Sequence, residues 1–357
     1  MAAPMPHHRT PDFAAIVAQV REDLRWLMQA EGEAVALTGT GTTGMEALVA
    51  NFVDPGGLFV SVGGGKFAER WGQIARAYGV PSLELAVQWG RAAEPEALAA
   101  LLDAHPEVKA VALTAVETST GVVHPIEALC AVVRRRDDVV LLVDGITAVG
   151  VMPLPADRLG IDGLVVGSQK IFAVPPGLCA VAISPRAWRL QPSPGLPRFS
   201  LDLRREADKQ ATGQTAFSPA ITLWMGMSAA LEGLRGEGLE GLWARHALAG
   251  RAARAGGAAL GLGCFAEVPC DAVTALLVPE GIDGQALVRA VRDRGVVISG
   301  GQDSLKGRIV RIGHLGSLTV EDVVMALGAL GESLAQLGWG VDPRAGAAAA
   351  SAIGAAR

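Results

Sequence analysis

The sequence predicts an α/β protein with a large, doubly wound and mostly parallel sheet, followed by a smaller C-terminal α/β unit. Short apolar runs alternate with helical patterns from about residue 34 to residue 183. Continuous apolar strands separated by helices are typical of a parallel sheet that helices cover on both faces. The chain has 357 residues, which is long for a single core, so two units are expected.

Composition supports a globular protein and excludes several classes of partner. Half of the residues are hydrophobic and 19% are charged. The net charge is -5, and the longest basic run is Arg134-Arg135-Arg136, so nucleic acid and anionic membrane are not expected as partners. The four cysteines show no CxxC spacing, and neither disulfides nor a metal site are predicted. With no apolar signal region at its start, the chain is expected to be cytoplasmic.

The first predicted unit is an N-terminal helix within residues 1–30. Pro11-Asp12-Phe13 has the proline and the acid that favour a helix start. Apolar residues then recur at helical spacing along one face. They are Phe13, Ile16, Val17, Val20, Leu24 and Leu27.

The large domain is predicted over residues 31–240. Its expected strands are apolar and four to eight residues long. They cover 34–38, 58–62, 82–86, 108–115, 139–143, 163–166 and 178–183. Helices are expected at 43–52, 66–78, 94–104 and 125–135. The Pro-rich segment 192–219 is expected to be loop, with helices following at 220–234 and 239–255.

A smaller α/β domain is predicted over residues 241–345, with an Ala/Gly-rich tail at 346–357. Its expected strands lie at 273–278, 296–299 and 308–312, and its helices at 284–294 and 319–337.

Two apolar strands of the large domain each end in a single charged residue. Leu141-Leu142-Val143 is followed by Asp144, and Gly167-Ser168-Gln169 by Lys170. A lysine amine condenses with an aldehyde, and a carboxylate keeps a pyridine nitrogen protonated. Pyridoxal phosphate requires both groups, so this pair predicts a site for that cofactor. A structural Lys–Asp pair is the alternative.

A glycine-rich turn follows the first strand of the sheet. Residues 39–44, Gly-Thr-Gly-Thr-Thr-Gly, match G-x-G-x-x-G at a strand-to-helix junction, as in dinucleotide sites. The next strand, 58–62, ends without the acid that would hold a ribose hydroxyl. The turn is therefore interpreted as a phosphate cup formed by Thr40, Gly41 and Thr42, and a turn without a ligand is the alternative.

Three further residues lie at the same edge of the predicted sheet. Phe67 could stack on a planar ring, although an aromatic there more often belongs to the core. Thr118, in Glu117-Thr118-Ser119-Thr120-Gly121, could contact a ring oxygen or simply cap a turn. Gln169, next to the lysine, could contact the phosphate.

An arginine interrupts the apolar strand at 308–312. Arg311 lies in Ile309-Val310-Arg311-Ile312. A buried guanidinium requires a carboxylate, either from a substrate that it binds at two points or from a structural ion pair. The sequence alone leaves both possibilities open.

These segments together resemble class V aminotransferases, with alanine/serine–glyoxylate aminotransferases as the closest group. The resemblance covers nearly the whole chain, and the combination of Ser-Gln-Lys with Pro-Pro-Gly is specific. The motifs that carry it are Thr40-Gly41-Thr42, Glu117 to Gly121, Leu142-Val143-Asp144, Gly167 to Lys170, Pro175-Pro176-Gly177 and Val310 to Gly313.

The resemblance implies fold type I, bound pyridoxal phosphate and a homodimer with active sites shared between subunits. Lys170 resembles the Schiff-base lysine, Asp144 the partner of the pyridine nitrogen, and Arg311 the arginine that binds the substrate carboxylate. The remaining matches resemble cofactor ligands. They are Thr40, Gly41, Thr42, Phe67, Thr118 and Gln169. The implied reaction moves an amino group from alanine or serine to glyoxylate or another small 2-oxo acid.

The chain departs from the family in two places. The family usually begins with a Gly/Pro-rich segment, whereas residues 1–5 read Met-Ala-Ala-Pro-Met. The start is then misassigned, or the substrate pocket is more open. The family often uses a tyrosine of the partner subunit on the phosphate, but Tyr78 is the only tyrosine. Gln214 and Thr215 are expected to take that role.

Three other functions fit parts of the sequence. A lyase of the cysteine-desulfurase type would require a cysteine on a mobile loop and commonly a histidine over the ring. A nicotinamide dehydrogenase would require the missing ribose acid. The third alternative is a pyridoxal-phosphate-binding scaffold that has lost activity.

Overall fold

A seven-stranded sheet forms the centre of the larger part of this protein. The computed structural model describes residues 3–356. Five neighbouring strands run parallel, and the last strand in sequence, β9, runs antiparallel to both of its neighbours. In spatial order the strands are β1 (Glu33–Gly39), β9 (Gly177–Ile183), β8 (Gly163–Gly167), β7 (Val140–Asp144), β4 (Val108–Thr114), β2 (Leu58–Val62) and β3 (Ser82–Leu85). The predicted mostly parallel sheet is confirmed.

Helices cover both faces of this sheet because successive side chains of each strand point to opposite sides. In β1, Ala34 and Ala36 belong to one apolar core, and Val35 and Leu37 to the other. The first core includes α1 (Pro11–Met28), α4 (Pro95–Ala104), α5 (Ile126–Val133) and α8 (Ile221–Glu237). The second includes α2 (Gly41–Phe52), α3 (Ala68–Ala77), α6 (Pro185–Leu190) and α7 (Leu203–Gln210).

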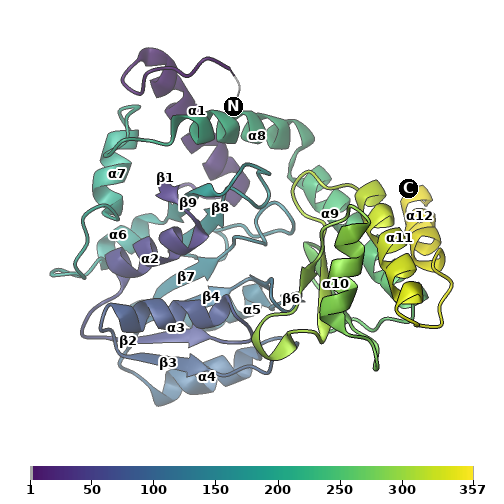
Figure 1. Cartoon of the computed structure of the whole chain (residues 1–357). Coiled ribbons are helices and arrows are strands. Elements are labelled where there is room, and N and C mark those ends of the chain that lie inside the picture. Colours follow the sequence, from purple (N-terminus) through teal and green to yellow (C-terminus); the bar gives the residue numbers. More distant parts are fainter. Residues whose placement is uncertain (1–2, 357) are drawn as a thin grey trace.

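The C-terminal part forms a separate layer beside the large sheet (Figure 1). An antiparallel sheet in the order β10 (Val273–Leu277), β12 (Ile309–Gly313), β11 (Ser299–Gly300) packs with helices around a core of its own. The helices are α9 (Leu239–Ala259), α10 (Gly284–Asp293), α11 (Val320–Gln336) and α12 (Ala345–Ala355), and a 3₁₀ turn, η1, covers Asp303–Leu305.

The structure contains several short elements that the sequence pattern did not predict. Helix α7 lies inside the segment 192–219, which was predicted to be loop. The prediction was wrong because the buried face of α7 includes only two apolar residues, Leu203 and Ala207, too few for a periodic pattern. The segment 346–357 includes most of α12, which packs against α9 and α11. A hairpin joins β5 (Val116–Glu117) to β6 (Val122–Val123). Over residues 3–356, no helix combines the length and apolar character needed to cross a bilayer.

Helix α2 packs closely on the sheet at Gly44. A Cβ placed on Gly44 would lie 2.5 Å from Cγ2 of Val165 in β8. Alanine in a helix interior raises the free energy of unfolding by about 1 kcal/mol relative to glycine, whereas overpacking a dense core lowers it by roughly 1 to 3 kcal/mol.

We therefore expect Gly44→Ala to lower the free energy of unfolding by about 1 kcal/mol in a urea titration. Gly233→Ala in α8 is the matched control, because a Cβ there meets nothing within 4 Å. The control should be neutral or stabilising. A stabilised Gly44→Ala would show that the helix can move away from the sheet at little cost.

Candidate functional site

A pocket of about 250 Å³ lies where the parallel strands of the large sheet end. Carboxyl ends of parallel strands meet at one edge, which is where α/β sheets bind ligands. The residues that line it come from the ends of β7 and β8, the start of α2, the segment before α3 and the turn after β5. They are Thr40, Gly41, Thr42, Phe67, Arg70, Thr118, Asp144, Ile146, Thr147, Gln169 and Lys170.

The start of α2 forms one side of the pocket. Thr40 precedes the helix, and its N–H donates to Oγ1 of Thr43 at 3.1 Å. The next N–H groups, of Gly41 and Thr42, have no intrahelical acceptor because they belong to the first turn. A Cβ on Gly41 would lie 2.3 Å from Cδ1 of Ile146, so a larger residue there would have to displace the Ile146 side chain. The helix start thus presents free N–H groups to an anion in the pocket.

Arg70 adds a positive charge to the same side. It lies one turn after Phe67 on α3, with its guanidinium carbon 4.9 Å from the centre of the Phe67 ring. Its Nη1 donates to Oγ1 of Thr42 at 3.0 Å. Sequence analysis missed Arg70, although its i+3 spacing from Phe67 indicates a shared helix face.

Lys170 lies in the turn that reverses the chain from β8 to β9. Hydrogen bonds hold both ends of this turn: Lys170 N–H donates to Gly167 O at 3.2 Å, and Ser168 Oγ donates to Pro175 O at 2.8 Å. The Lys170 amine forms no hydrogen bond or ion pair within residues 3–356. Burial lowers the pKa of Lys170, and the charge of Asp144 acts in the opposite direction.

Asp144 ends β7 and is only 5% exposed. Its Oδ1 accepts the N–H of Ile146 at 2.8 Å, and in the described part of the chain the carboxylate has no ion-pair partner. Burial raises the pKa of Asp144 to about 7, whereas the Ile146 hydrogen bond acts to lower it. The alternative of a structural Lys–Asp ion pair is not supported, because neither group forms an ion pair within residues 3–356, and both line the pocket.

Phe67 and Thr118 are held from behind by a buried loop. The N–H of Phe67 donates to Oε2 of Glu117 at 3.0 Å. Thr118 Oγ1 lies 2.7 Å from Oγ1 of Thr147, so the two hydroxyls share a hydrogen bond. Glu117 and Thr147 were not predicted as site residues. Glu117 stands in the motif that resembles the family, but its contacts with Phe67 and Ala68 and the contact of Thr147 with Thr118 join residues distant in sequence.

Arg311 reaches the rim of the site from the C-terminal sheet. It is 8% exposed, and its Nη1 donates to the carbonyl of Thr118 at 2.8 Å. Its Nε and Nη2 donate to the carbonyl of Gly300 at 3.1 and 3.0 Å. No ion pair involves Arg311 within residues 3–356, which disfavours the structural ion pair. A guanidinium has five N–H donors, so one remains on each of Nη1 and Nη2, as a carboxylate requires for two-point binding.

Two predicted cofactor ligands lie outside this pocket. Gln214 and Thr215 belong to the loop between α7 and α8, where Thr215 Oγ1 donates to Phe217 O at 2.6 Å. Thr215 lines a separate hollow together with Phe217 and Ser200. Within one chain, the structure does not bring these two residues to Lys170.

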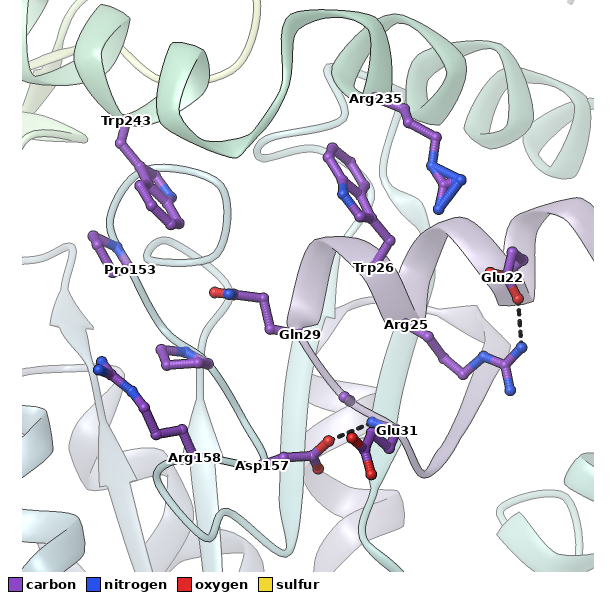
Figure 2. A pocket seen from close by; sticks show the side chains of 12 residues that line it. Glu22, Arg25, Trp26, Gln29, Glu31, Pro153, Asp157, Arg158, Arg235 and Trp243 are labelled. Carbon is purple, nitrogen blue, oxygen red and sulfur yellow. Dashed lines mark hydrogen bonds and ion pairs between the residues drawn. The ribbon is translucent and has the colours of Figure 1, made fainter.

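A larger hollow of about 1090 Å³ lies between the C-terminal end of α1, the segment 153–158, Arg235 of α8 and Trp243 of α9 (Figure 2). Several of its charged side chains have partners in the protein. Arg25 pairs with Glu22, Arg235 pairs with Asp23, and Asp157 accepts the N–H of Glu31. The smaller pocket is the better candidate site, because Asp144 and Lys170, whose pKa values are shifted, both line it and form no ion pair within residues 3–356. Within residues 3–356 there is no group of three or more His, Cys, Asp or Glu side chains placed to hold a metal ion.

The pKa of Asp144 gives a test that requires no ligand. An aspartate in an unfolded chain titrates near pH 4, so the ligand-free folded protein retains a proton that the unfolded chain releases. Between about pH 4 and pH 7 this lowers the free energy of unfolding as the pH rises. Asp144→Asn cannot ionise and still accepts the Ile146 N–H. At pH 8 we expect the ligand-free variant to be more stable than the wild type by roughly 2 to 4 kcal/mol, with little difference at pH 4.

Urea unfolding of both proteins over this pH range measures the difference. A gap that widens towards low pH would contradict the raised pKa.

Comparison with known proteins places the chain in a family. Aminotransferase class-V matches residues 2–323. A relative from Synechococcus sp. (strain PCC 6716), the small subunit of a soluble hydrogenase, is 38% identical over 97% of this chain and 91% of its own. An L-aspartate–glyoxylate aminotransferase from Paracoccus denitrificans is 32% identical over 97% and 90%.

Among solved structures, pyridoxamine-pyruvate aminotransferase from Mesorhizobium loti superposes with a TM-score of 0.93. It is 30% identical and is matched over 99% of this chain and 92% of its own. The family match and the shared fold agree with each other over nearly the whole chain. The chain belongs to the aminotransferase class-V family.

Proposed function

We propose that this protein is a pyridoxal-phosphate-dependent transaminase that moves an amino group from a small L-amino acid, alanine or serine, to glyoxylate or another small 2-oxo acid. One observation carries the proposal: the buried acid Asp144 and the partly buried amine Lys170 line one pocket at a strand-end edge, and neither forms an ion pair within residues 3–356. Unpaired buried ionisable groups are costly, so they mark sites where a ligand completes the charge balance.

The residues present fit pyridoxal phosphate. The N–H groups at the start of α2, the Thr40 and Thr42 hydroxyls and Gln169 would hold the phosphate, with Arg70 beside them. Asp144 would face the ring nitrogen and Phe67 the ring. The hydroxyls of Thr118 and Thr147 would face the ring oxygen.

Bound pyridoxal phosphate supplies an aldehyde that takes up an amino group and a ring that withdraws electrons. Asp144, once it faces a cation, is ionised and keeps the ring nitrogen protonated. Arg311 binds the substrate carboxylate through its free Nη1 and Nη2 donors and so orients the α-carbon. Burial lowers the pKa of Lys170, so more of its amine is neutral and can accept the α-proton as a general base.

We also propose a homodimer in which Gln214 and Thr215 complete the phosphate site of the partner subunit. The exposed rings of Phe199 and Phe217 lie beside this loop, 5.7 Å apart, with Arg205 over both. Exposed aromatic pairs of this kind favour an interface. None of the residues that line the pocket is a cysteine, which disfavours a cysteine-desulfurase type of lyase.

Lys170→Ala tests the proposal directly. We expect loss of the visible absorbance that the wild type shows with pyridoxal phosphate, and loss of transfer from alanine or serine to glyoxylate by at least about a thousandfold. Lys109→Ala is the control, since that lysine forms an exposed ion pair with Asp138 at the far end of β4. An unchanged spectrum in Lys170→Ala would refute the assignment. A wild type that binds the cofactor but transfers no amino group would support the inactive scaffold instead.

Arg311→Lys tests substrate binding. Lysine keeps the charge but lacks the planar fork that binds a carboxylate at two points. We expect the KM for the amino donor to rise roughly 10- to 100-fold, as for the loss of a charged hydrogen bond, with the cofactor absorbance unchanged.

Steady-state kinetics at saturating acceptor measures the change. Arg294→Lys is the control, because Arg294 lies at the C-terminal end of α10 and donates to Glu332 of α11, outside the pocket. An unaltered KM would assign the substrate carboxylate to another residue.

A further inference from the structure

The most completely buried acid near the pocket is Glu117, at the end of β5. Its side chain is 0% exposed and forms no ion pair within residues 3–356. We propose that Glu117 is a positioning residue: its carboxylate fixes the Phe67 ring and, through the adjoining Thr118 peptide, the Arg311 guanidinium relative to each other. The proposal rests on the proposed function, since it assigns these two residues to the cofactor ring and the substrate carboxylate.

Four donors surround the Glu117 carboxylate. Oε2 accepts the N–H groups of Phe67 at 3.0 Å and Ala68 at 2.9 Å. Oε1 accepts the N–H of Ser119 at 2.9 Å and its hydroxyl at 2.6 Å. An ionised carboxylate only accepts, so this set matches the charged form, which the N-terminus of α3 also favours. Burial raises the pKa of Glu117, and the Ser119 and Ala68 hydrogen bonds act against that effect.

Residues 65 and 66, which precede α3, pack closely against Glu117 and Ser119. A Cβ on Gly65 would lie 2.3 Å from Cγ of Glu117 and 2.6 Å from Oγ of Ser119, so no side chain fits at position 65. The N–H of Lys66 donates to the same Ser119 hydroxyl at 3.1 Å. The position of Phe67 therefore follows from Glu117 and Ser119.

The other side of the same loop holds the substrate end of the site. The Thr118 carbonyl accepts Nη1 of Arg311, and Glu117 is the nearby negative charge that acts to raise the pKa of Arg311 against its burial. Glu117 thus compensates the guanidinium without occupying its two free donors. A carboxylate in direct contact with Arg311 would take the place of the substrate.

A second connection closes the network between the large and small sheets. Lys66 Nζ pairs with Oδ2 of Asp303 at 2.7 Å. Asp303 lies three residues after Gly300, whose carbonyl holds the other edge of Arg311. The segments around residues 66, 117 and 300 are therefore tied to one another in a ring of contacts. Glu117 supplies the only fully buried charge of that ring.

Glu117→Gln tests this role, because the amide nitrogen cannot accept and one pair of donors loses its acceptor. Two quantities are measured: the affinity of ligand-free protein for pyridoxal phosphate, by visible absorbance and circular dichroism, and KM and kcat for the amino donor. We expect cofactor affinity to fall on the order of tenfold, KM for the donor to rise by a similar factor, and the visible circular dichroism to change as the ring tilts.

Asp23→Asn is the matched control. Asp23 is a buried acid of α1 that accepts from Gln19 and pairs with Arg235, outside the pocket. It should keep the wild-type affinity, KM and circular dichroism. Ser119→Ala retains the charge and removes one donor. It should lower the affinity for pyridoxal phosphate and raise the KM for the donor by about threefold each, with a circular dichroism change of the same sign as in Glu117→Gln. If Glu117→Gln does not fold, Ser119→Ala tests the proposal in its place.

Wild-type affinity, KM and circular dichroism in Glu117→Gln would overturn the proposal and reduce Glu117 to a helix cap. Failure of the wild-type protein to bind pyridoxal phosphate would instead refute the proposed function, and the same titration shows which has failed.

Discussion

The cost of removing charges from water is the constraint on which this structure depends. An ionised group that is buried without a partner loses its hydration and must be compensated by fixed dipoles, hydrogen bonds or a ligand. Around one pocket, Asp144 and Arg311 are buried and Lys170 is partly buried, and none of the three forms an ion pair within residues 3–356. Asp144 and Arg311 are compensated by hydrogen bonds to the backbone. The two apolar cores on either face of the large sheet supply the stability that allows such groups to persist. The charged groups at the pocket therefore lower the free energy of unfolding, and the two apolar cores of the large sheet offset that loss.

Much of the fold could be predicted from the sequence because its signals are local. The apolar runs at 108–115 and 178–183 predicted β4 and β9, since strands buried on both faces have no need of polar residues. The antiparallel direction of β9 could not be read in the same way, because strand direction depends on the connection and not on composition. Helix α7 was missed because two buried apolar residues are too few for a periodic signal.

The candidate site was predicted unevenly for a similar reason. Lys170 and Asp144 are conspicuous because each is a single charge that ends or closely follows an apolar strand. Arg70 and Thr147 have ordinary surroundings in sequence and become part of the site only through contacts with α2 and with Thr118. Glu117 belongs to a motif that sequence analysis identified, but the predicted site residue of that motif was its neighbour Thr118. Its importance depends on residues 65–68, which reach it only after folding.

The antiparallel reversal between β8 and β9 has a consequence for how a ligand is received. The chain leaves the sheet at Gly167 and re-enters it at Gly177, so the turn that bears Lys170 is fastened at both ends to neighbouring strands. A turn held in this way loses little conformational entropy when a ligand binds, because folding has already ordered its backbone. Lys170 therefore lies on a turn that is already ordered before a ligand binds, and not on a mobile loop that closes over the ligand. Loading should alter the side chain far more than the backbone, and amide hydrogens of this turn should exchange at similar rates before and after a ligand enters.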